Sequence, residues 1–464
     1  MSSTAIDPDV AHAPAGKPDR AFFGHPKGLG FLAFTEAWER FSFYGMQALL
    51  VLYMVNRLLL PGHIEHVAGF ATFRALIERA YGPLSAQGLA SAVFGFYAGA
   101  VYLTPILGGL IADRLLGKRR TVIVGGLLMA TGHFLLAFEQ PFLLALLCLV
   151  LGNGCFKGNI ASQVGALYPP GDHRAADAFQ IFYLGINGGV ILAPLICGTL
   201  GEKVDWHWGF AAAGVGMLLG LTIYLSGQKH LPPDPKAVKG VVVERPKLKP
   251  GEGKVLALLI LMLPVLAIGL VGNQEIFNAY LVWAQRSANF SLFGHAFPIT
   301  WLITLDSIVS VGGLFGAVVF WQWYAKHWRE PDELTKIILG TTISMSGVVL
   351  LAVAAGLSAG TGAKVGLGWL IGFHILNDIG FANVLPVSLA LYSRAAPPAL
   401  GATVVGVYYL HLFGANTLIG YIGGLLDKMP ATEFWLLHAG LIGASAVILL
   451  GVKLMFGKLV AKAG

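Results

Sequence analysis

The chain has 464 residues, of which 56% are hydrophobic and only 12% are charged. A soluble protein carries about 25% charged residues, so this composition excludes an ordinary soluble globular protein. The formal net charge is +7, but the basic residues are spread between apolar segments, so we expect no nucleic-acid partner.

Apolar segments close to or above the ~20 residues that cross a bilayer recur along the whole chain. We therefore predict an all-α polytopic membrane protein with twelve transmembrane helices. The predicted spans are residues 29–59, 84–112, 120–139, 142–167, 175–201, 208–227, 254–285, 298–325, 335–357, 364–392, 402–426 and 432–457.

The polar segments divide the chain. Residues 1–28 form an N-terminal tail without a signal-peptide core, so the first span is expected to act as the insertion signal. Segment 60–83 contains a predicted amphipathic helix. The longest polar segment between spans, 228–253, is rich in Pro and Lys and separates residues 29–227 from residues 254–464, with six spans in each part. This division predicts two six-helix bundles joined by a linker, as in transporters built from two related halves.

Most of the 31 Lys and Arg residues lie in predicted loops on one side of the membrane. Cytoplasmic loops carry an excess of Lys and Arg, so both termini and the linker are predicted to be cytoplasmic. We expect a multi-pass protein of the cytoplasmic membrane, in contact with the lipid bilayer.

Ionisable side chains interrupt the first span near its middle. Glu36 and Arg40 are four residues apart and can pair on one helix face, which Tyr44 and Gln47 continue and beside which Glu39 lies. Charged groups at this depth are costly and mark substrate or proton pathways. We expect the acids and the arginine to couple proton binding to transport. A buried ion pair that only fixes helix packing is the alternative.

Lys157 lies in "GNGCFKGN" (152–159), well inside the fourth span. A lone buried lysine loses its proton or needs a carboxylate, and Glu36 or Glu39 is the expected partner. Protonation of that acid would weaken the pair, which links proton binding to a rearrangement of helices. A lysine that extends its ammonium group to the membrane surface is the alternative.

These motifs resemble the proton-dependent oligopeptide transporter (POT) family of the major facilitator superfamily. The resemblance rests on "ExxERFxxYG" (36–45), "GGLIADRLLGKRRTVIVGGLLMATG" (108–132), the lysine motif and "FQIFYLGINGG" (179–189), which together cover the first half. In the second half it rests on span order, "FPITW" (297–301) and Pro and Gly placements. The resemblance implies the superfamily fold without an extra helix pair between the halves. It also implies proton-driven import of di- and tripeptides by alternating access, with protons as coupling ion, no cofactor and a functional monomer.

The resemblance also implies substrate-binding residues. Arg40 and Lys157 would receive the peptide carboxylate, and Tyr44, Tyr97 and Asn187 would line the cavity. A carboxylate suits a forked guanidinium and an ammonium, and amide groups suit hydroxyl and carboxamide partners. For Tyr97 and Asn187, a hydrogen bond that only joins two helices is the alternative.

Two acids are candidates for gating. Asp113 lies in "GGLIADRLLGKRR" (108–120), at the cytoplasmic mouth of the second and third spans, and is expected to lock the closed gate. A charged loop that only follows topology is the alternative. Glu275 follows the glutamine of "NQEIFNAY" (273–280), where the family often has an acid before the glutamine. It is a candidate for that acid's gating role, with a helix-packing contact as the alternative.

The residue that would bind the amino terminus of a peptide is not evident. Phe381 stands where the family has the glutamate that would receive it. Asp306 and Asp378 are the candidates, and we favour Asp378 because it is farther from a span end. Either acid could instead only bond a neighbouring helix. His374 precedes Asp378 by one helical turn, but it falls on no family motif.

Three other functions are alternatives. The same fold with another small organic solute, such as nitrate, an organic acid or a modified amino acid, is the closest rival, because the family residues of the seventh and tenth spans are altered. An enzyme is not expected, since the sequence has no P-loop, no nucleophile–base arrangement and no cysteines at metal-ligand spacing. A channel would more naturally repeat one pore segment.

Overall fold

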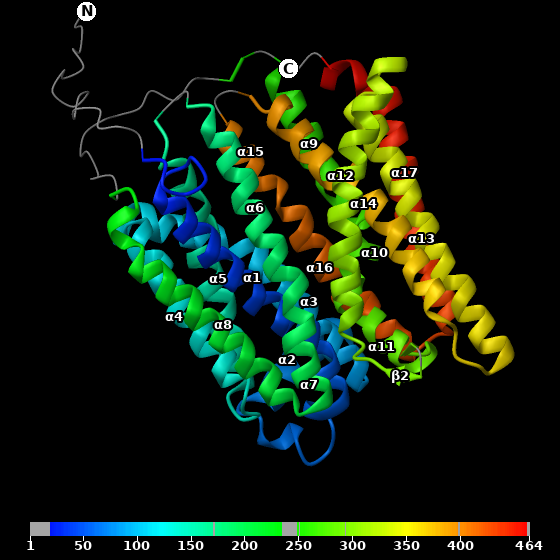
Figure 1. Ribbon diagram of the computed structural model, residues 1–464. Helices are drawn as coiled ribbons and strands as arrows, with labels where there is room; N and C mark the ends of the chain where they lie inside the picture. The colour runs from blue at the N-terminus through cyan, green and yellow to red at the C-terminus, as the bar shows by residue number, and fades with distance from the viewer. Residues whose placement is uncertain are drawn as a thin grey trace, which may run out of the picture.

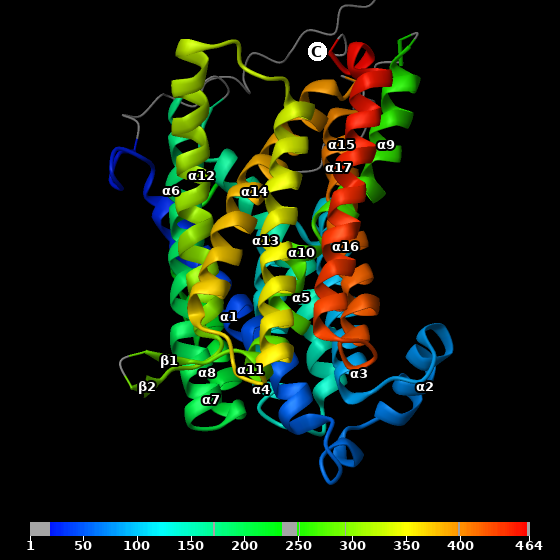
Figure 2. The same ribbon diagram turned by 90° about the vertical axis from the view of Figure 1, so that its right-hand side faces the viewer.

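The computed structural model describes residues 19–169, 172–233, 248–249, 251–292, 294–397 and 400–461. These residues are almost entirely helical (Figures 1 and 2). Most of the predicted N-terminal tail and most of the predicted linker lie outside the described residues.

The first half of the chain contains eight α-helices and several single turns of other helix types. The α-helices are α1 (Lys27–Tyr53), α2 (Phe70–Tyr81), α3 (Ala86–Ile111), α4 (Lys118–Leu135), α5 (Phe142–Gly165), α6 (Arg174–Ala193), α7 (Thr199–Lys203) and α8 (Trp206–Ser226). The shorter turns are η2 (Met54–Leu58), η3 (Ile64–His66), η4 (Ala112–Leu116), η5 (Pro194–Gly198) and η6 (Gln228–His230). Helix α2 lies within the segment for which an amphipathic helix was predicted.

The second half is built in the same way, with one short antiparallel hairpin. The α-helices are α9 (Glu252–Gly269), α10 (Val271–Gln274), α11 (Ala279–Ser287), α12 (Trp301–His327), α13 (Glu333–Thr361), α14 (Leu367–Ala395), α15 (Gly401–Tyr408), α16 (Leu410–Ile422) and α17 (Ala431–Ala461). The 3-10 turns are η7 (Glu275–Phe277) and η8 (Gly423–Asp427), and the hairpin strands are β1 (Ser291–Leu292) and β2 (His295–Ala296).

Two spans that the sequence predicted as continuous are broken helices. Span 254–285 is divided into α9, α10, η7 and α11, with irregular backbone at Leu270 and Asn278. Span 402–426 is divided into α15 and α16 at Tyr409. Non-helical backbone at membrane depth is tolerated where protein buries it or where it lines a cavity. These breaks therefore point to the interior between the helices.

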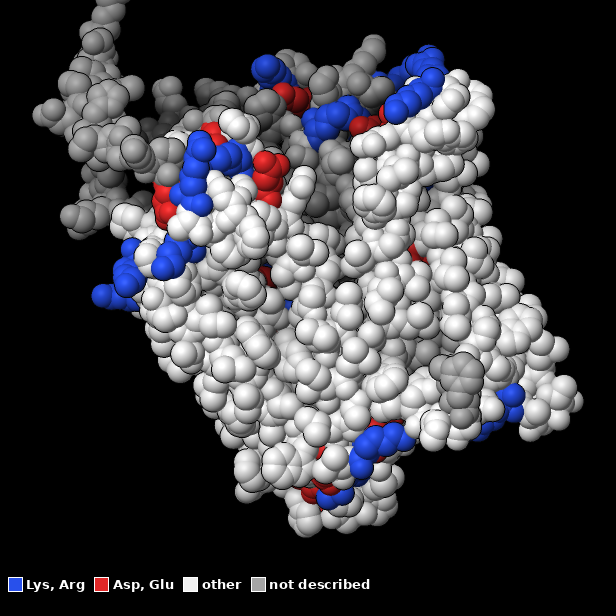
Figure 3. All heavy atoms as spheres, viewed as in Figure 1, with Lys and Arg blue, Asp and Glu red and all other residues white. Residues whose placement is uncertain are grey.

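The surface and the helix lengths agree with a protein that crosses the membrane several times. Nine helices in the described part of the chain are long and apolar enough to do so. Helix α1, which carries Glu36, Glu39 and Arg40, is not among them. In the view of Figure 3, charged side chains gather at the two ends of the molecule and leave an almost uncharged band between them.

The helices form two groups that follow the two halves of the chain (Figure 1). In the first, α1 packs against α6 and α8, and α5 packs against α3 and α4. In the second, α14 packs against α12 and α13, and α17 packs against α13 and α9. The groups meet along α3–α16 and α6–α12. Helix α1 begins and α17 ends at one end of the molecule, the terminal face, and α2 and the hairpin lie at the other, the α2 face.

Hydrogen bonds join the two groups near the α2 face. They run from Asn56 Nδ2 to Gln285 Oε1 (3.2 Å), from Ser85 Oγ to Asp427 Oδ2 (2.8 Å) and from the backbone N–H of Thr300 to Glu202 Oε1 (2.8 Å). Each bond connects an element of the first half to one of the second. The α2 face is therefore closed by contacts between the halves.

Glycines let the backbone of α3 touch the backbones of α16 and η8. A Cβ atom added to Gly95 would lie only 2.5 Å from the Cα of Gly420, and one on Gly424 would lie 2.9 Å from the Cα of Gly88. Such distances leave no room for a side chain. Small residues at a helix contact allow this close approach in membranes, and we call the four residues the glycine seam.

Candidate functional site

A polar cavity of about 260 Å³ lies between the two groups of helices. Helices α1, α3, α6, α10, α12, α14 and α16 contribute to its wall. Its polar lining residues are Tyr44, Gln47, Tyr102, Tyr183, Asn187, Asn273, Gln274, Asp306, Ser307 and Ser310. A small number of polar groups in a concave site between domains is typical of a binding site for a small molecule.

The central cavity continues toward the terminal face. It shares Tyr183, Leu314 and Leu385 with a second cavity of about 910 Å³. That cavity extends to Lys326, in the last turn of α12, and to Glu330, in the loop that follows this helix. The structure is thus open at the terminal face and closed at the α2 face.

The charged residues of α1 form a buried group beside this cavity. Arg40 Nε lies 3.0 Å from Glu36 Oε1 and 2.5 Å from Glu39 Oε2, and Asn153 Nδ2 lies 3.5 Å from Glu39 Oε1. The ion pairs are not aligned as hydrogen bonds, because within the described residues neither Nε nor Nη2 of Arg40 has a hydrogen-bond partner. Tyr44, one turn further along α1, reaches the cavity wall. The predicted group on one helix face is therefore present, with Arg40 still able to donate.

Lys157 does not pair as the sequence suggested. Its Nζ lies 4.9 Å from the ring centroid of Tyr102 on α3, and among the described residues it forms no ion pair with Glu36 or Glu39. Arg40 takes both acids instead. The reason is geometric, since Arg40 is on the same helix as the acids, whereas Lys157 approaches from α5.

The other two residues assigned to the cavity by resemblance differ in position. Asn187 lines it, and its Nδ2 donates to the carbonyl oxygen of Tyr183 one turn earlier on α6 (2.8 Å). Tyr97 is buried on α3 and is not a lining residue of the described cavity, and its hydroxyl has no hydrogen-bond partner within the described chain.

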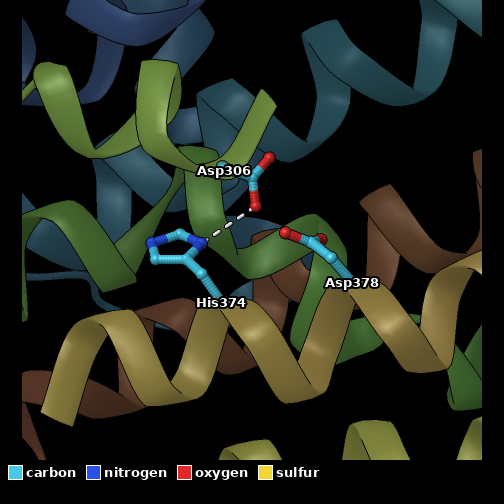
Figure 4. A group of neighbouring side chains, drawn as sticks. All are labelled: Asp306, His374 and Asp378. Carbon is cyan, nitrogen blue, oxygen red and sulfur yellow. Dashed lines mark hydrogen bonds and ion pairs between the residues drawn. The ribbon is translucent and has the colours of Figure 1, made fainter. Parts of the chain in front are cut away.

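A second buried group lies in the other half and includes both acids proposed for the amino terminus (Figure 4). Asp306 of α12 lines the cavity, and its Oδ1 lies 3.0 Å from His374 Nδ1 on α14. His374 Nε2 lies 2.9 Å from the hydroxyl of Tyr280 on α11. Asp378, one turn beyond His374, points toward Asp306 and is 1% exposed. Depth in the span favours Asp378 as the contact for the amino terminus, but the acid at the cavity wall is Asp306.

Phe381 also lines the cavity. The position that holds a glutamate in the family pattern therefore faces the same space as Asp306, which lines the cavity from the neighbouring helix α12.

The two residues considered for gating lie in different surroundings. Asp113, in η4 at the terminal face, is exposed and forms no hydrogen bond or ion pair within the described residues. An exposed acid is what the open terminal face would leave at this position. Glu275 is fully buried in η7, where its Oε2 lies 3.2 Å from His438 Nε2 and its Oε1 accepts from the backbone N–H of Ala279 (3.0 Å).

Comparison with known proteins places the chain in a family. A family model described as PTR2, POT family, matches residues 119–245. The uncharacterized transporter YclF of Bacillus subtilis is 30% identical over 502 aligned positions, which cover 96% of each chain. The chain belongs to the POT family.

Other members have similar sequences and structures. The peptide transporter YePEPT of Yersinia enterocolitica is 29% identical, covering 93% of this chain and 94% of that protein. A crystal structure of the peptide transporter POT in complex with sulfate superposes with a TM-score of 0.81 at 27% identity, covering 95% of this chain and 97% of that one. Because the proteins of this family are transporters, the chain described here is a transporter as well.

Sequence reasoning missed the partners that complete the buried groups of this POT-family chain. His374 bridges Asp306 and Tyr280, and His438 faces Glu275. The spacing of His374 and Asp378 was the one usable signal, because residues four apart share a helix face. Nothing in the sequence relates His438 to Glu275, since the two lie on different helices far apart in the chain.

Proposed function

We propose that this chain is a proton-coupled symporter that imports di- and tripeptides across the cytoplasmic membrane by alternating access. The substrate class is supported by YePEPT and by the di-/tripeptide transporter of Lactococcus lactis, which is 28% identical over 95% of this chain. Protons are the coupling ion, no cofactor takes part, no reaction is catalysed, and one copy of the chain suffices.

The proposal includes the complete major facilitator fold. Twelve crossings in two bundles of six follow if consecutive elements that continue one helix are counted together and α2 is not counted. Elements counted together in this way include α6–η5–α7, α9–α10–η7–α11 and α15–α16–η8. The excess of Lys and Arg in loops on the side of the terminal face supports a cytoplasmic location for both termini.

The observation that carries the proposal is the charge balance of the buried group beside the cavity. Glu36 and Glu39 are balanced by Arg40, with which both form ion pairs, and by Lys157, which lies on the neighbouring α5. When one acid takes a proton, one positive charge is left without a partner. A buried unpaired charge is unfavourable, and the carboxylate of a peptide would neutralise it. Proton and peptide would therefore bind together, as symport requires.

Arg40 supplies the contact for that carboxylate. Its Nη2 is buried and has no hydrogen-bond partner among the described residues, so a carboxylate would satisfy a donor that is otherwise unmatched. Lys157 would assist, and Tyr44 and Asn187, at the cavity wall, would bond the peptide amides. Tyr97 would act behind this wall, where its hydroxyl is unsatisfied.

Asp306 is the proposed contact for the amino terminus, with Asp378 behind it. An ammonium group that enters the cavity needs a negative partner, and Asp306 is the acid that lines the cavity. Replacing Asp306 by Asn should reduce the preference for dialanine over N-acetyl-dialanine, measured as competition for binding to the purified protein. Equal discrimination by the variant and the wild type would exclude this contact.

Uptake by proteoliposomes tests the function as a whole. Labelled dialanine should accumulate above its external concentration when an inward proton gradient is imposed, and a protonophore should abolish the accumulation. Liposomes without protein are the control. Accumulation that is independent of the gradient would refute proton coupling.

A different solute is the second candidate, because Phe381 presents an apolar ring to the cavity at the position of the family's glutamate. Nitrate, small organic acids and modified amino acids should be added as competitors in the same uptake assay. A solute without a free amine that competes better than dialanine would favour this alternative.

A further inference from the structure

The second buried group has a feature that substrate binding alone does not explain. The ligand atoms of Asp306, His374 and Asp378 all lie within 4.8 Å of one another, and all three residues are buried. Neither carboxyl group forms an ion pair with Lys or Arg in the part of the chain that the structure describes. Two carboxylates at this distance cannot both be ionised at neutral pH without a strong penalty.

The hydrogen bonds of the ring are compatible with a neutral imidazole. In that form Tyr280 donates its hydroxyl hydrogen to His374 Nε2 (2.9 Å), and His374 Nδ1 donates to Asp306 Oδ1 (3.0 Å). A neutral ring supplies no charge that would balance two carboxylates. In a protonated ring Nε2 would donate to Tyr280 instead, and Oδ2 of Asp378 would still have no donor among the described residues.

The surroundings of Asp378 are independent evidence that a proton is bound here. Its side chain is 1% exposed and points at Asp306 (Figure 4). Its Oδ1 accepts a long bond from Asn377 Nδ2 (3.4 Å), whereas its Oδ2 has no hydrogen-bond partner among the described residues. A buried carboxylate oxygen without a donor is costly. A proton on Oδ2 of Asp378 that is donated to a carboxylate oxygen of Asp306 would satisfy the oxygens of both residues.

Within the described residues, the other helices around the group offer no charge that replaces this proton. Tyr44 of α1 and Tyr183 of α6 line the same cavity as Asp306, and α13 presents Ser344, which donates to Asn377. Helix α10 presents no titratable side chain, and Glu275, which follows it, is paired with His438. The tyrosine hydroxyls are neutral at physiological pH.

We propose that Asp306, His374 and Asp378 form a proton-binding site in the second half of the chain, in which the two carboxyl groups share one proton. Asp306 exchanges the proton with the cavity, because it alone of the three lines that space. With one proton bound, the site carries a single negative charge, which suits the ammonium group of a peptide. A second proton would remove that charge. Proton binding at this site therefore controls how well the amine of a peptide is bound. This consequence rests on the proposed function, whereas the existence of the proton-binding site does not depend on it.

Infrared difference spectroscopy of the purified full-length protein without peptide tests the site directly. The wild type should show the C=O band of a protonated carboxylic acid at neutral pH, and Asp378→Asn should remove one such band, because the amide replaces the protonated acid. Asp177→Asn is the matched control, since Asp177 is exposed at the start of α6. An Asp378→Asn spectrum with the wild-type carboxylic-acid bands would overturn the proposal.

His374→Ala tests the positioning role of the ring. Loss of the donor to Asp306 should shift the carboxylate band of that residue in the infrared spectra, because a hydrogen bond to the carboxylate is removed. His374→Gln, which can still donate, should shift the band less. No shift in either variant would refute the assigned hydrogen bonds.

A measurement of peptide binding distinguishes the proposal of a proton-binding site from the proposal that the chain transports peptides. If the site holds the proton but the chain does not transport peptides, the infrared result stands and dialanine fails to bind. The site would also be refuted if Zn²⁺ raised the melting temperature of the wild type but not that of Asp378→Asn while the carboxylic-acid bands stayed the same, because the group would then be a metal site.

Discussion

Glu275 of η7 and His438 of α17 face each other with 3.2 Å between Oε2 and Nε2, and neither side chain is exposed. The other ring nitrogen, Nδ1, lies 2.8 Å from the carbonyl oxygen of Phe434, which can only accept, so Nδ1 carries a hydrogen. Nε2 then either donates to ionised Glu275 or accepts from protonated Glu275. The pair holds a proton in both cases and ties the broken helix to α17.

Glu275→Ala should lower the stability of the protein by about 2 kcal/mol, because it leaves a buried ring nitrogen unpaired. Thermal unfolding of the purified protein in detergent measures this. Glu433→Ala, at an exposed position at the start of α17, is the control. Glu275→Gln keeps the shape of the pair, so if Glu275 gates transport, this variant should fold like the wild type and turn over more slowly. If Glu275→Gln transports at the wild-type rate, Glu275 does not gate transport and serves only in helix packing.

Glu36→Gln and Glu39→Gln test the proton acceptor of the first half. The variant that lacks the coupling acid should lose uptake driven by a proton gradient but retain exchange of peptide across the membrane without a gradient, because the cavity at Tyr44 and Asn187 is unchanged. Both modes are measured in the same proteoliposomes. Accumulation at the wild-type level by both variants would exclude these acids as the coupling site.

Lys157 should be required for coupled transport even though it is not paired with an acid in this state. Lys157→Ala removes one of the two positive charges near Glu36 and Glu39 and should abolish gradient-driven uptake, whereas Lys157→Arg keeps the charge and should retain part of it. Lys326→Ala, at the end of α12, is a control for the loss of a lysine charge. Full accumulation by the Lys157→Ala variant would contradict the role.

Asp113 should act on the rate of transport and not on affinity. It is exposed and without a partner in the described part of the chain, so Asp113→Asn should leave peptide affinity in this open state unchanged and slow the closure of the terminal face. Equilibrium binding and initial uptake rates separate the two effects. A large loss of affinity with normal turnover would place Asp113 in the binding site instead.

The side-chain groups that could be predicted from sequence are those whose ionisable residues all lie on one apolar helix. Glu36, Glu39 and Arg40 are visible because three ionisable residues interrupt an apolar segment. Contacts between helices could not be predicted in the same way. The pairing of Glu275 with His438, and of Asp306 with His374, depends on how helices far apart in sequence are rotated against each other.

The broken helices escaped prediction for a different reason. The segment around Leu270 stays apolar through the break, so hydropathy alone shows one span. The direct ion pair expected between Lys157 and Glu36 or Glu39 is not formed within the described residues, because Arg40 already pairs with both acids. Depth in the membrane places Lys157 near these acids but does not tell which of two cations contacts them.

In the proposed alternating-access cycle, the glycine seam would be the line about which the two halves rotate against each other. Gly95 and Gly420 bring the two halves into backbone contact on the side of the closed face, so rocking of one half against the other would use this line as its pivot. A methyl group at Gly95 would act there as a wedge, since its carbon would lie 2.5 Å from the opposite backbone. Alanine at this position would prop the α2 face open and leave the two states unequal in energy, although it lies outside the cavity and touches no charged group.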